Sequence, residues 1–122
     1  MDKKKILLVD DEQDVVEHVG SLLKTSGFDV VCADCGSLAL RLARDAKPDV
    51  IILDVFLPDI DGGEIAHRLS LNRETSSIPI IFLTGLVTKN EKDQPDRSGK
   101  HFVIAKPLLK QELFTVISQV LK

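Results

Sequence analysis

The sequence Val-Ile-Ile-Leu-Asp at residues 50–54 is followed by Val-Phe-Leu-Pro-Asp-Ile-Asp-Gly-Gly at residues 55–63. Four consecutive large aliphatic residues predict a strand that is buried on both faces, as in a parallel sheet covered by helices. Asp54 stands where this apolar run stops, and open parallel α/β sheets bind ligands outside the carboxyl ends of their strands. Pro58 and the glycines that follow predict a rigid turn into a helix. The stretch therefore indicates a buried strand with a functional carboxylate at its end.

Three other apolar runs also end in polar residues. They are residues 6–9 before Asp10, Asp11 and Glu12, residues 80–83 before Thr84, and residues 102–105 before Lys106. If the four strands are parallel, these polar ends meet at one edge of the sheet. Carboxylates gathered there repel each other unless a cation lies between them, and hard oxygen ligands suit Mg²⁺. A lysine and a hydroxyl at the same edge are the groups that neutralise and bind a phosphoryl group.

Length and composition predict one globular domain over residues 1–122. The chain is 43% hydrophobic and 29% charged, which is ordinary for a soluble domain. Its net charge of −3, without a dense basic cluster, gives no indication of nucleic-acid binding. No apolar run has membrane-spanning length, and acidic residues follow the first strand too soon for a signal peptide. We therefore expect a cytoplasmic protein.

Cys32 and Cys35 form an isolated Cys-x-x-Cys pair. A redox pair would be expected before a helix, together with other features of a redox site. A zinc site would need two more ligands, and His18, His67 and His101 are scattered without ligand spacing. The pair is therefore interpreted as two reduced thiols near the end of a strand.

Helical segments alternate with the strands. After the first strand, Asp14 is expected to cap a helix that ends before Gly27, and residues 28–33 form the second strand. Asp34 or Ser37 is expected to cap the next helix. A third helix is expected from about residue 63 to residue 72, and a last helix follows the final strand.

Residues 87–100 break this pattern, because they have no apolar periodicity and contain a proline. A short, loosely packed helix or a mobile loop is expected there, since almost no apolar face is available for burial. Five strands that alternate with about five helical segments predict an α/β fold with a doubly wound parallel sheet.

Together these residues resemble the receiver domain of two-component response regulators. The resemblance is carried by Asp10-Asp11, Asp54, Leu57-Pro58-x-x-Asp61-Gly62, Thr84-Gly85 and Lys106-Pro107. Each of these motifs is weak alone, but all of them occur in order, each closing an apolar run. The resemblance extends from the first strand to the last helix. It implies a single receiver domain with a flavodoxin-like sheet in the strand order 2-1-3-4-5.

The resemblance implies a phosphoacceptor function. Asp54 would attack the phosphohistidine of a histidine kinase and become an aspartyl phosphate. Lys106 would pair with the phosphoryl group, and Thr84 would move its hydroxyl toward a phosphoryl oxygen and couple the chemistry to a population shift. The implied function is a signalling switch that changes conformation to control a partner.

The resemblance also implies a Mg²⁺ site. Asp11 and Asp54 would bind the ion directly, Asp10 would bind it through water, and the backbone carbonyl of Phe56 would complete the protein ligands. Mg²⁺ normally keeps several waters and takes only one or two carboxylates from the protein. Glu12 is expected to contribute little to the acidic pocket.

Two features depart from the family pattern: the polar stretch at residues 87–100 stands where the family has the fourth helix of its signalling surface, and the usual switch aromatic is missing. The family commonly has an aromatic residue three places before the lysine, where this chain has Val103, with Phe102 one place earlier. Adjacent strand residues point to opposite faces, so Phe102 does not substitute for it. Phe56 and Leu86, each two places after a site residue, are apolar and cannot orient an attacking water. We therefore predict slow self-hydrolysis of the aspartyl phosphate.

Two alternatives belong to other functional classes. A Mg²⁺-dependent phosphatase with an aspartyl nucleophile would carry a second carboxylate two places after it, where this chain has Phe56. A pseudo-receiver that only binds a partner would lack part of the site, but the acidic pair, acceptor, threonine and lysine are all present. We therefore expect a phosphoacceptor that is not a turnover enzyme.

The expected partners are proteins. The phosphoryl donor would be a histidine kinase or a phosphotransfer protein, recognised partly by the surface of the first helix, residues 14–22. No effector domain follows Lys122 in this sequence, so we expect output through a partner protein or a phosphorelay step; the alternative is a receiver excised from a larger regulator or hybrid kinase. Dimerisation on phosphorylation is compatible with the sequence, whereas direct nucleic-acid binding and membrane insertion are not predicted. Asp59 and Asp61 are expected to be turn and helix-cap residues.

Overall fold

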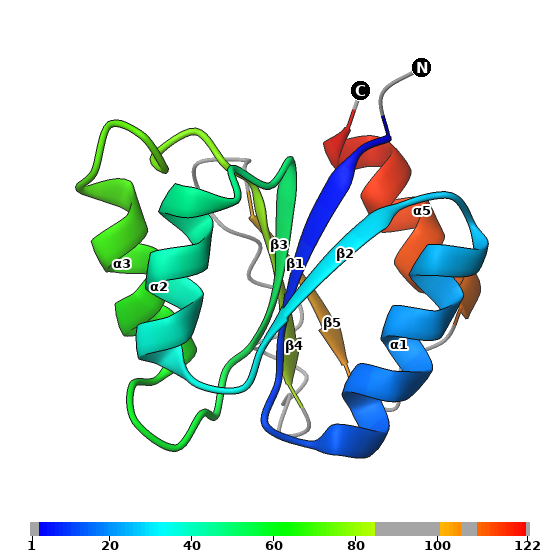
Figure 1. Ribbon diagram of the computed structural model, residues 1–122, viewed down its shortest axis with the longest axis horizontal. Coiled ribbons are helices and arrows are strands. Elements are labelled where there is room, and N and C mark those ends of the chain that lie inside the picture. Colours follow the sequence, from blue (N-terminus) through cyan, green and yellow to red (C-terminus); the bar gives the residue numbers. More distant parts are fainter. Residues whose placement is uncertain (1–2, 85–100, 106–109, 122) are drawn as a thin grey trace.

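A computed structural model describes residues 3–84, 101–105 and 110–121, with the backbone alone at residues 84, 101 and 105. Five parallel strands form one sheet in the order β2-β1-β3-β4-β5 (Figure 1). The strands are β1 (Lys5–Val9), β2 (Asp29–Ala33), β3 (Val50–Asp54), β4 (Ile80–Thr84) and β5 (His101–Ala105). The described helices are α1 (Gln13–Thr25), α2 (Gly36–Asp45), α3 (Gly62–Ser70) and α5 (Lys110–Val120). The predicted doubly wound sheet and its strand order are confirmed.

The aliphatic run at residues 50–53 lies at the centre of the sheet. β3 pairs with β1 on one side and with β4 on the other. Its four aliphatic side chains are at most 1% exposed. Since neighbouring side chains of a strand point to opposite faces, this burial requires a covering layer on both sides of the sheet.

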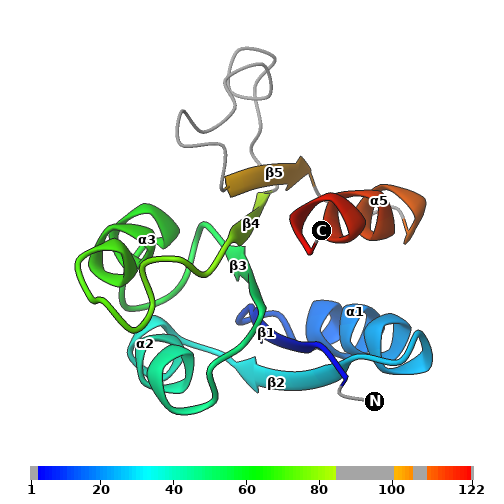
Figure 2. The ribbon, with the colours of Figure 1, turned by 90° about the horizontal axis from the view of Figure 1, so that it is seen from above.

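Helices cover both faces of the sheet, as the view in Figure 2 shows. On one face the core is completed by Val19 and Leu23 of α1 and by Leu113 and Ile117 of α5. On the other face it is completed by Ala39 and Ala43 of α2 and by Ile65 and Leu69 of α3. The two residues of each pair are four positions apart, a spacing that places them on the same side of the helix.

The predicted cap residues of the first two helices are wrong. Glu12, not Asp14, is the N-cap of α1, and it makes no side-chain capping bond. The N-cap of α2 is Cys35, rather than Asp34 or Ser37. Local sequence favoured the wrong residues because aspartate and serine are the usual caps, whereas the backbone here turns one or two residues away from them.

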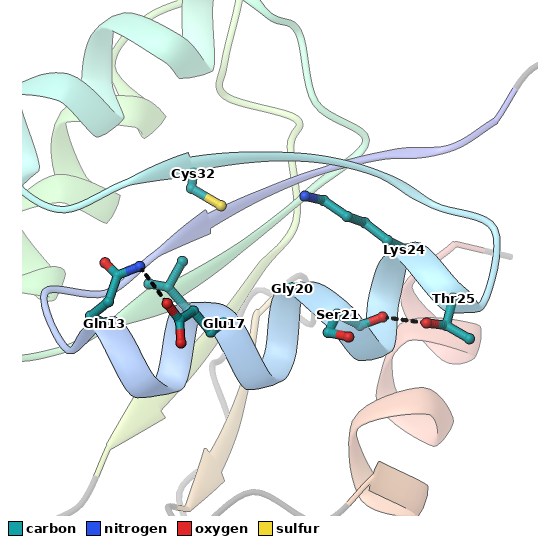
Figure 3. Close-up of a pocket in the computed structure, with 8 residues that line it drawn as sticks. Gln13, Glu17, Gly20, Ser21, Lys24, Thr25 and Cys32 are labelled. Carbon is teal, nitrogen blue, oxygen red and sulfur yellow. Dashed lines mark hydrogen bonds between the residues drawn. The ribbon is translucent and has the colours of Figure 1, made fainter.

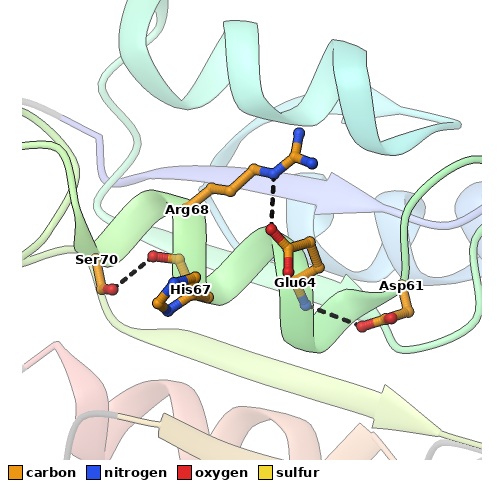
Figure 4. A network of polar contacts seen from close by, with 5 residues as sticks. All are labelled: Asp61, Glu64, His67, Arg68 and Ser70. Carbon is orange, nitrogen blue, oxygen red and sulfur yellow. Dashed lines mark hydrogen bonds and ion pairs between the residues drawn. The ribbon is translucent and has the colours of Figure 1, made fainter.

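The third helix begins close to where the sequence places it. Asp61 is the N-cap of α3, and its Oδ1 accepts a hydrogen bond from the backbone N–H of Glu64 at 2.9 Å (Figure 4). The cap role expected of Asp61 is therefore confirmed. The same figure shows the exposed ion pair between Arg68 Nε and Glu64 Oε2, also 2.9 Å apart. An exposed pair of this kind adds little stability.

The irregular segment expected at residues 87–100 lies outside the described residues. None of the helices within residues 3–84 and 110–121 is long and apolar enough to cross a lipid bilayer.

The turn after α3 depends on a buried hydroxyl. Thr75 is 1% exposed, and its Oγ1 donates to the backbone carbonyl of Leu69 at 2.7 Å. That carbonyl belongs to the last turn of α3, where carbonyl groups have no partner within the helix. The bond therefore satisfies a buried acceptor and fixes the chain as it leaves the helix.

Replacing Thr75 by valine should destabilise the protein by about 1 kcal/mol, because the shape is kept while the Leu69 carbonyl loses the shorter of its two hydrogen bonds and keeps only the one from the N–H of Asn72 at 3.3 Å. The free energy of unfolding would be measured by urea titration. Thr25→Val is the matched control, since Thr25 Oγ1 makes a similar 2.7 Å bond to Ser21 O at an exposed site. Equal losses in the two variants would contradict this assignment.

Candidate functional site at the carboxyl edge of the sheet

Two carboxylates are buried side by side at the carboxyl ends of the central strands. Val9 and Leu53 are register partners in β1 and β3, so the next residues, Asp10 and Asp54, leave the sheet next to each other. Asp10 is 0% exposed and Asp54 is 3% exposed. Two like charges in so dry a place repel each other strongly, and a cation between them would remove that repulsion.

A third carboxylate completes this group. Carboxylate oxygens of Asp10, Glu12 and Asp54 all lie within 4.8 Å of one another. Asp11, which the family pattern makes a ligand, is exposed and is not part of this group. Three acidic residues follow one another here, and the bend of the backbone at Asp11 determines which of them face β3. The sequence named all three but ranked Glu12 last.

Backbone N–H groups hold the two buried carboxylates in place. Asp10 Oδ1 accepts a hydrogen bond from the N–H of Glu12 at 2.9 Å. Asp54 Oδ1 accepts one from the N–H of Phe56 at 3.2 Å. Such bonds limit the rotation of each carboxylate group. The ring of Phe56 is 56% exposed, so an apolar side chain stands in solvent two places after Asp54.

The loop from β3 to α3 folds closely against the end of β3. Gly62 donates its N–H to the carbonyl of Val55 at 2.7 Å. A Cβ atom at Gly62 would lie 2.9 Å from Val55 Cα and 3.1 Å from the carbonyl oxygen of Asp54. Only glycine allows the start of α3 to approach the backbone of Asp54 this closely.

Asp59, in the same loop, binds the first turn of α2. Its Oδ1 accepts a hydrogen bond from the N–H of Gly36 at 2.7 Å, and its Oδ2 accepts one from Ser37 at 3.0 Å. These donors, joined by the N–H of Ile60, hold the pKa of Asp59 below its ordinary value. The folded-state pKa is depressed, so the contact is present at neutral pH and is lost only as the pH falls through that lowered pKa.

Of the other predicted site residues, the structure describes only the backbone of Thr84. Thr84 is the last residue of β4, at the same edge of the sheet. Lys106, together with Gly85, Leu86 and Pro107, lies outside the described residues.

The expected orientation of the residues before the lysine is confirmed. Phe102 packs against the core on the α1 and α5 side. Val103 is 41% exposed and pairs in register with Phe82, which packs against the core of the opposite face. Phe102 therefore does not occupy the place that Val103 leaves without an aromatic ring.

A groove of about 460 Å³ runs between α1 and the edge strand β2 (Figure 3). Gln13, Ser21 and Lys24 of the helix and Cys32 of the strand are among the residues that line it. Cys32 and Cys35 are both free, as the sequence predicted. Partial desolvation of the sulfur raises the pKa of the Cys32 thiol, although the residue as a whole is exposed, and the Lys24 ammonium lowers it by a smaller amount. A raised pKa keeps the Cys32 thiol protonated at neutral pH, and the thiol is less nucleophilic than the thiolate.

A model of a known protein family covers most of the chain. The model of the response regulator receiver domain matches residues 6–118. The chain belongs to the response regulator receiver domain family. Membership gives it the signalling function of a receiver in two-component systems, as the sequence predicted.

Curated relatives of this receiver differ in length. Protein PilH of Pseudomonas aeruginosa is 32% identical over 117 residues, which cover 96% of this chain and 97% of PilH. The polar-differentiation response regulator DivK of Brucella ovis is 30% identical, covering 86% of this chain and 85% of DivK. The alkaline phosphatase synthesis transcriptional regulatory protein PhoP of Bacillus subtilis is 35% identical, but the match spans 49% of its length.

Solved structures show the same fold. The receiver superimposes with a TM-score of 0.89 on a putative response regulator from Chloroflexus aurantiacus, at 32% identity and 98% coverage of both chains. It superimposes with a TM-score of 0.87 on the chemotaxis response regulator CheY4 of Vibrio cholerae, at 28% identity, covering 98% of this chain and 99% of CheY4.

The glycines at the start of α3 should respond differently to alanine. Gly62→Ala should lower the free energy of unfolding by about 1–3 kcal/mol, because the new Cβ would collide with the backbone of Val55. Gly63→Ala is the control, since its Cβ would meet only the Asp61 carboxylate oxygen, at 3.2 Å. Chemical denaturation of both variants tests this, and a Gly62→Ala protein as stable as the Gly63→Ala protein would disprove it.

Proposed function

We propose that Asp54 is the phosphoacceptor of this receiver. The observation that carries the proposal is its position. Asp54 ends the central strand, is almost fully buried, and shares a pocket with Asp10 and Glu12. A carboxylate so placed is fixed in orientation and still faces the edge of the sheet at which ligands of parallel α/β folds bind.

The same pocket is proposed to hold Mg²⁺. Three carboxylate oxygens within 4.8 Å of one another are the hard ligands that this ion prefers, so the donor set fits. Asp10, Asp54 and Glu12 would hold the ion, and the family pattern adds Asp11 and the backbone carbonyl of Phe56. When bound, Mg²⁺ neutralises the oxygens of the phosphoryl group.

Phosphoryl transfer would follow from these positions. A carboxylate oxygen of Asp54 forms the new bond to phosphorus while the bond from phosphorus to the donor histidine nitrogen breaks, and that nitrogen keeps the electron pair. The N–H of Phe56 holds Asp54 Oδ1 and limits rotation of the nucleophile. Lys106 and Thr84 are proposed to bind the transferred group.

The donor is proposed to be a histidine kinase or a phosphotransfer protein, and the output a downstream protein. The surface of α1 from Asp14 to Leu22 is proposed to contribute to partner recognition. The protein is proposed not to turn over a substrate, because Phe56 stands where an aspartyl-nucleophile phosphatase needs a second carboxylate. Phosphorylation-linked dimerisation and the cytoplasmic location stay predictions.

The acceptor can be tested by intact mass spectrometry after incubation with a small phosphoryl donor and Mg²⁺. We expect the mass of one added phosphoryl group in the natural protein. It should be absent from Asp54→Asn and from samples without Mg²⁺, since the first lacks the nucleophile and the second lacks charge neutralisation. Phosphorylation of Asp54→Asn would contradict the assignment, and no gain in either protein would favour a pseudo-receiver.

The aspartyl phosphate should be long-lived, because the exposed ring of Phe56 can neither orient nor activate water. Replacing Phe56 by asparagine should speed hydrolysis by about tenfold or more, as a positioned polar group does for an attacking water. Loss of the added mass over time measures this rate. Leu71→Asn is the control, since Leu71 is 73% exposed at the far end of α3. A half-life of seconds in the natural protein would contradict the prediction.

A further inference from the structure

A single carboxylate joins the loop after the phosphoacceptor strand to a different helix. Asp59 lies in the loop between β3 and α3, yet its two oxygens accept hydrogen bonds from Gly36 and Ser37, 23 and 22 residues earlier in the sequence. Gly36 and Ser37 are the first residues of α2, whose backbone N–H groups have no partner within the helix. Asp59 therefore supplies the cap that Cys35, the N-cap residue of α2, does not supply.

The two segments are also in close steric contact. Gly36 is buried, and a Cβ atom placed on it would lie 2.9 Å from Ile60 Cβ and 3.1 Å from Asp59 Oδ1. No side chain fits at this position without moving the loop. The contact therefore depends on glycine at the start of α2 and on aspartate in the loop.

The loop is fixed at its other end as well. Phe56 donates its N–H to Asp54 Oδ1, and Gly62 donates its N–H to the carbonyl of Val55. The segment from 55 to 60 is thus held to the acceptor carboxylate at one end and to α2 at the other. A displacement of either end must therefore be taken up by the residues between Phe56 and Asp59.

We propose that Asp59 is a positioning residue, which holds the loop carrying Phe56 in the geometry that binds Mg²⁺ and links the first turn of α2 to that site. The inference rests on the proposed metal site. Residues outside the ligand set that orient the ligands typically change metal affinity by about 10- to 100-fold when they are replaced. Because coupling is reciprocal, Mg²⁺ binding must also affect the amides of Gly36 and Ser37.

The test is a titration with MgCl₂ followed by the amide signals of nitrogen-labelled protein in NMR. Signals of residues 54–56 report the affinity of the site, and signals of Gly36 and Ser37 report the link to α2. Asp59→Ala should weaken Mg²⁺ binding by about tenfold, at the low end of the range for such residues. It should also abolish the response of the two α2 amides. Asp59→Asn keeps one acceptor oxygen and should recover part of both effects.

Asp49→Ala is the matched control. Asp49 Oδ2 also accepts a long-range backbone hydrogen bond, from Lys5 N at 2.8 Å, but at the opposite edge of the sheet, where β1 and β3 begin. This variant should lose stability and keep the affinity for Mg²⁺ and the α2 response. A merely structural role of Asp59 would make the two alanine variants behave alike, and would overturn the inference.

A second variant reaches the same contact from α2. Gly36→Ala keeps the amide and favours the helix, but its Cβ would push Ile60 away. It should weaken Mg²⁺ binding as Asp59→Ala does, so the test does not depend on one variant that folds poorly. Unchanged affinity in both variants would overturn the inference and leave the phosphoacceptor site standing. No Mg²⁺ binding by the natural protein would overturn the metal site and this inference together.

Discussion

The site of this receiver depends on two buried carboxylates at the ends of the neighbouring strands β1 and β3. Asp10 and Asp54 are almost fully removed from water, and burying a carboxylate costs several kcal/mol unless it is paired or bonded. Two backbone N–H groups offset part of that cost, and the aliphatic strands behind the carboxylates offset more through their own burial. What remains is an electrostatic repulsion that a divalent cation relieves. Burial of the aliphatic strands therefore offsets the unfavourable placement of two carboxylates side by side.

The loops at this edge of the sheet are held by contacts with the first turns of α2 and α3. Gly62 allows the start of α3 to meet the backbone of Asp54, and Asp61 caps the same helix from its own turn. Asp59 reaches farther, to α2. Each contact uses a backbone N–H group at the start of a helix, where the helix itself provides no acceptor. The same bonds therefore cap the helices and hold the loop in place.

Much of this structure follows from the sequence because burial dictates it. The aliphatic run at residues 50–53 could only be a strand covered on both faces, and residues that close such runs had to meet at one edge. The strand order came from the family resemblance, since periodicity does not define neighbours. The predicted cap residues of α1 and α2 were wrong. For α2 the reason is physical: the carboxylate that caps its first turn belongs to Asp59, which no local sequence pattern connects to this helix. Glu12, not Asp11, joins Asp10 and Asp54 in the acidic group because the backbone bends at Asp11. A run of three acidic residues does not reveal that bend.

The sheet separates two surfaces that meet at the acidic pocket. The groove between α1 and β2 lies on one side of β1, and the contact between Asp59 and α2 lies on the other face of the sheet. Close-packed strands between them transmit displacement and do not absorb it. The loop that follows Asp54 is bonded to β4 through the N–H of Val55, which donates to the carbonyl of Leu83, and to the first turn of α2 through Asp59. Within the described residues, one covalent and hydrogen-bonded route from Asp54 to α2 runs through Phe56 and Asp59.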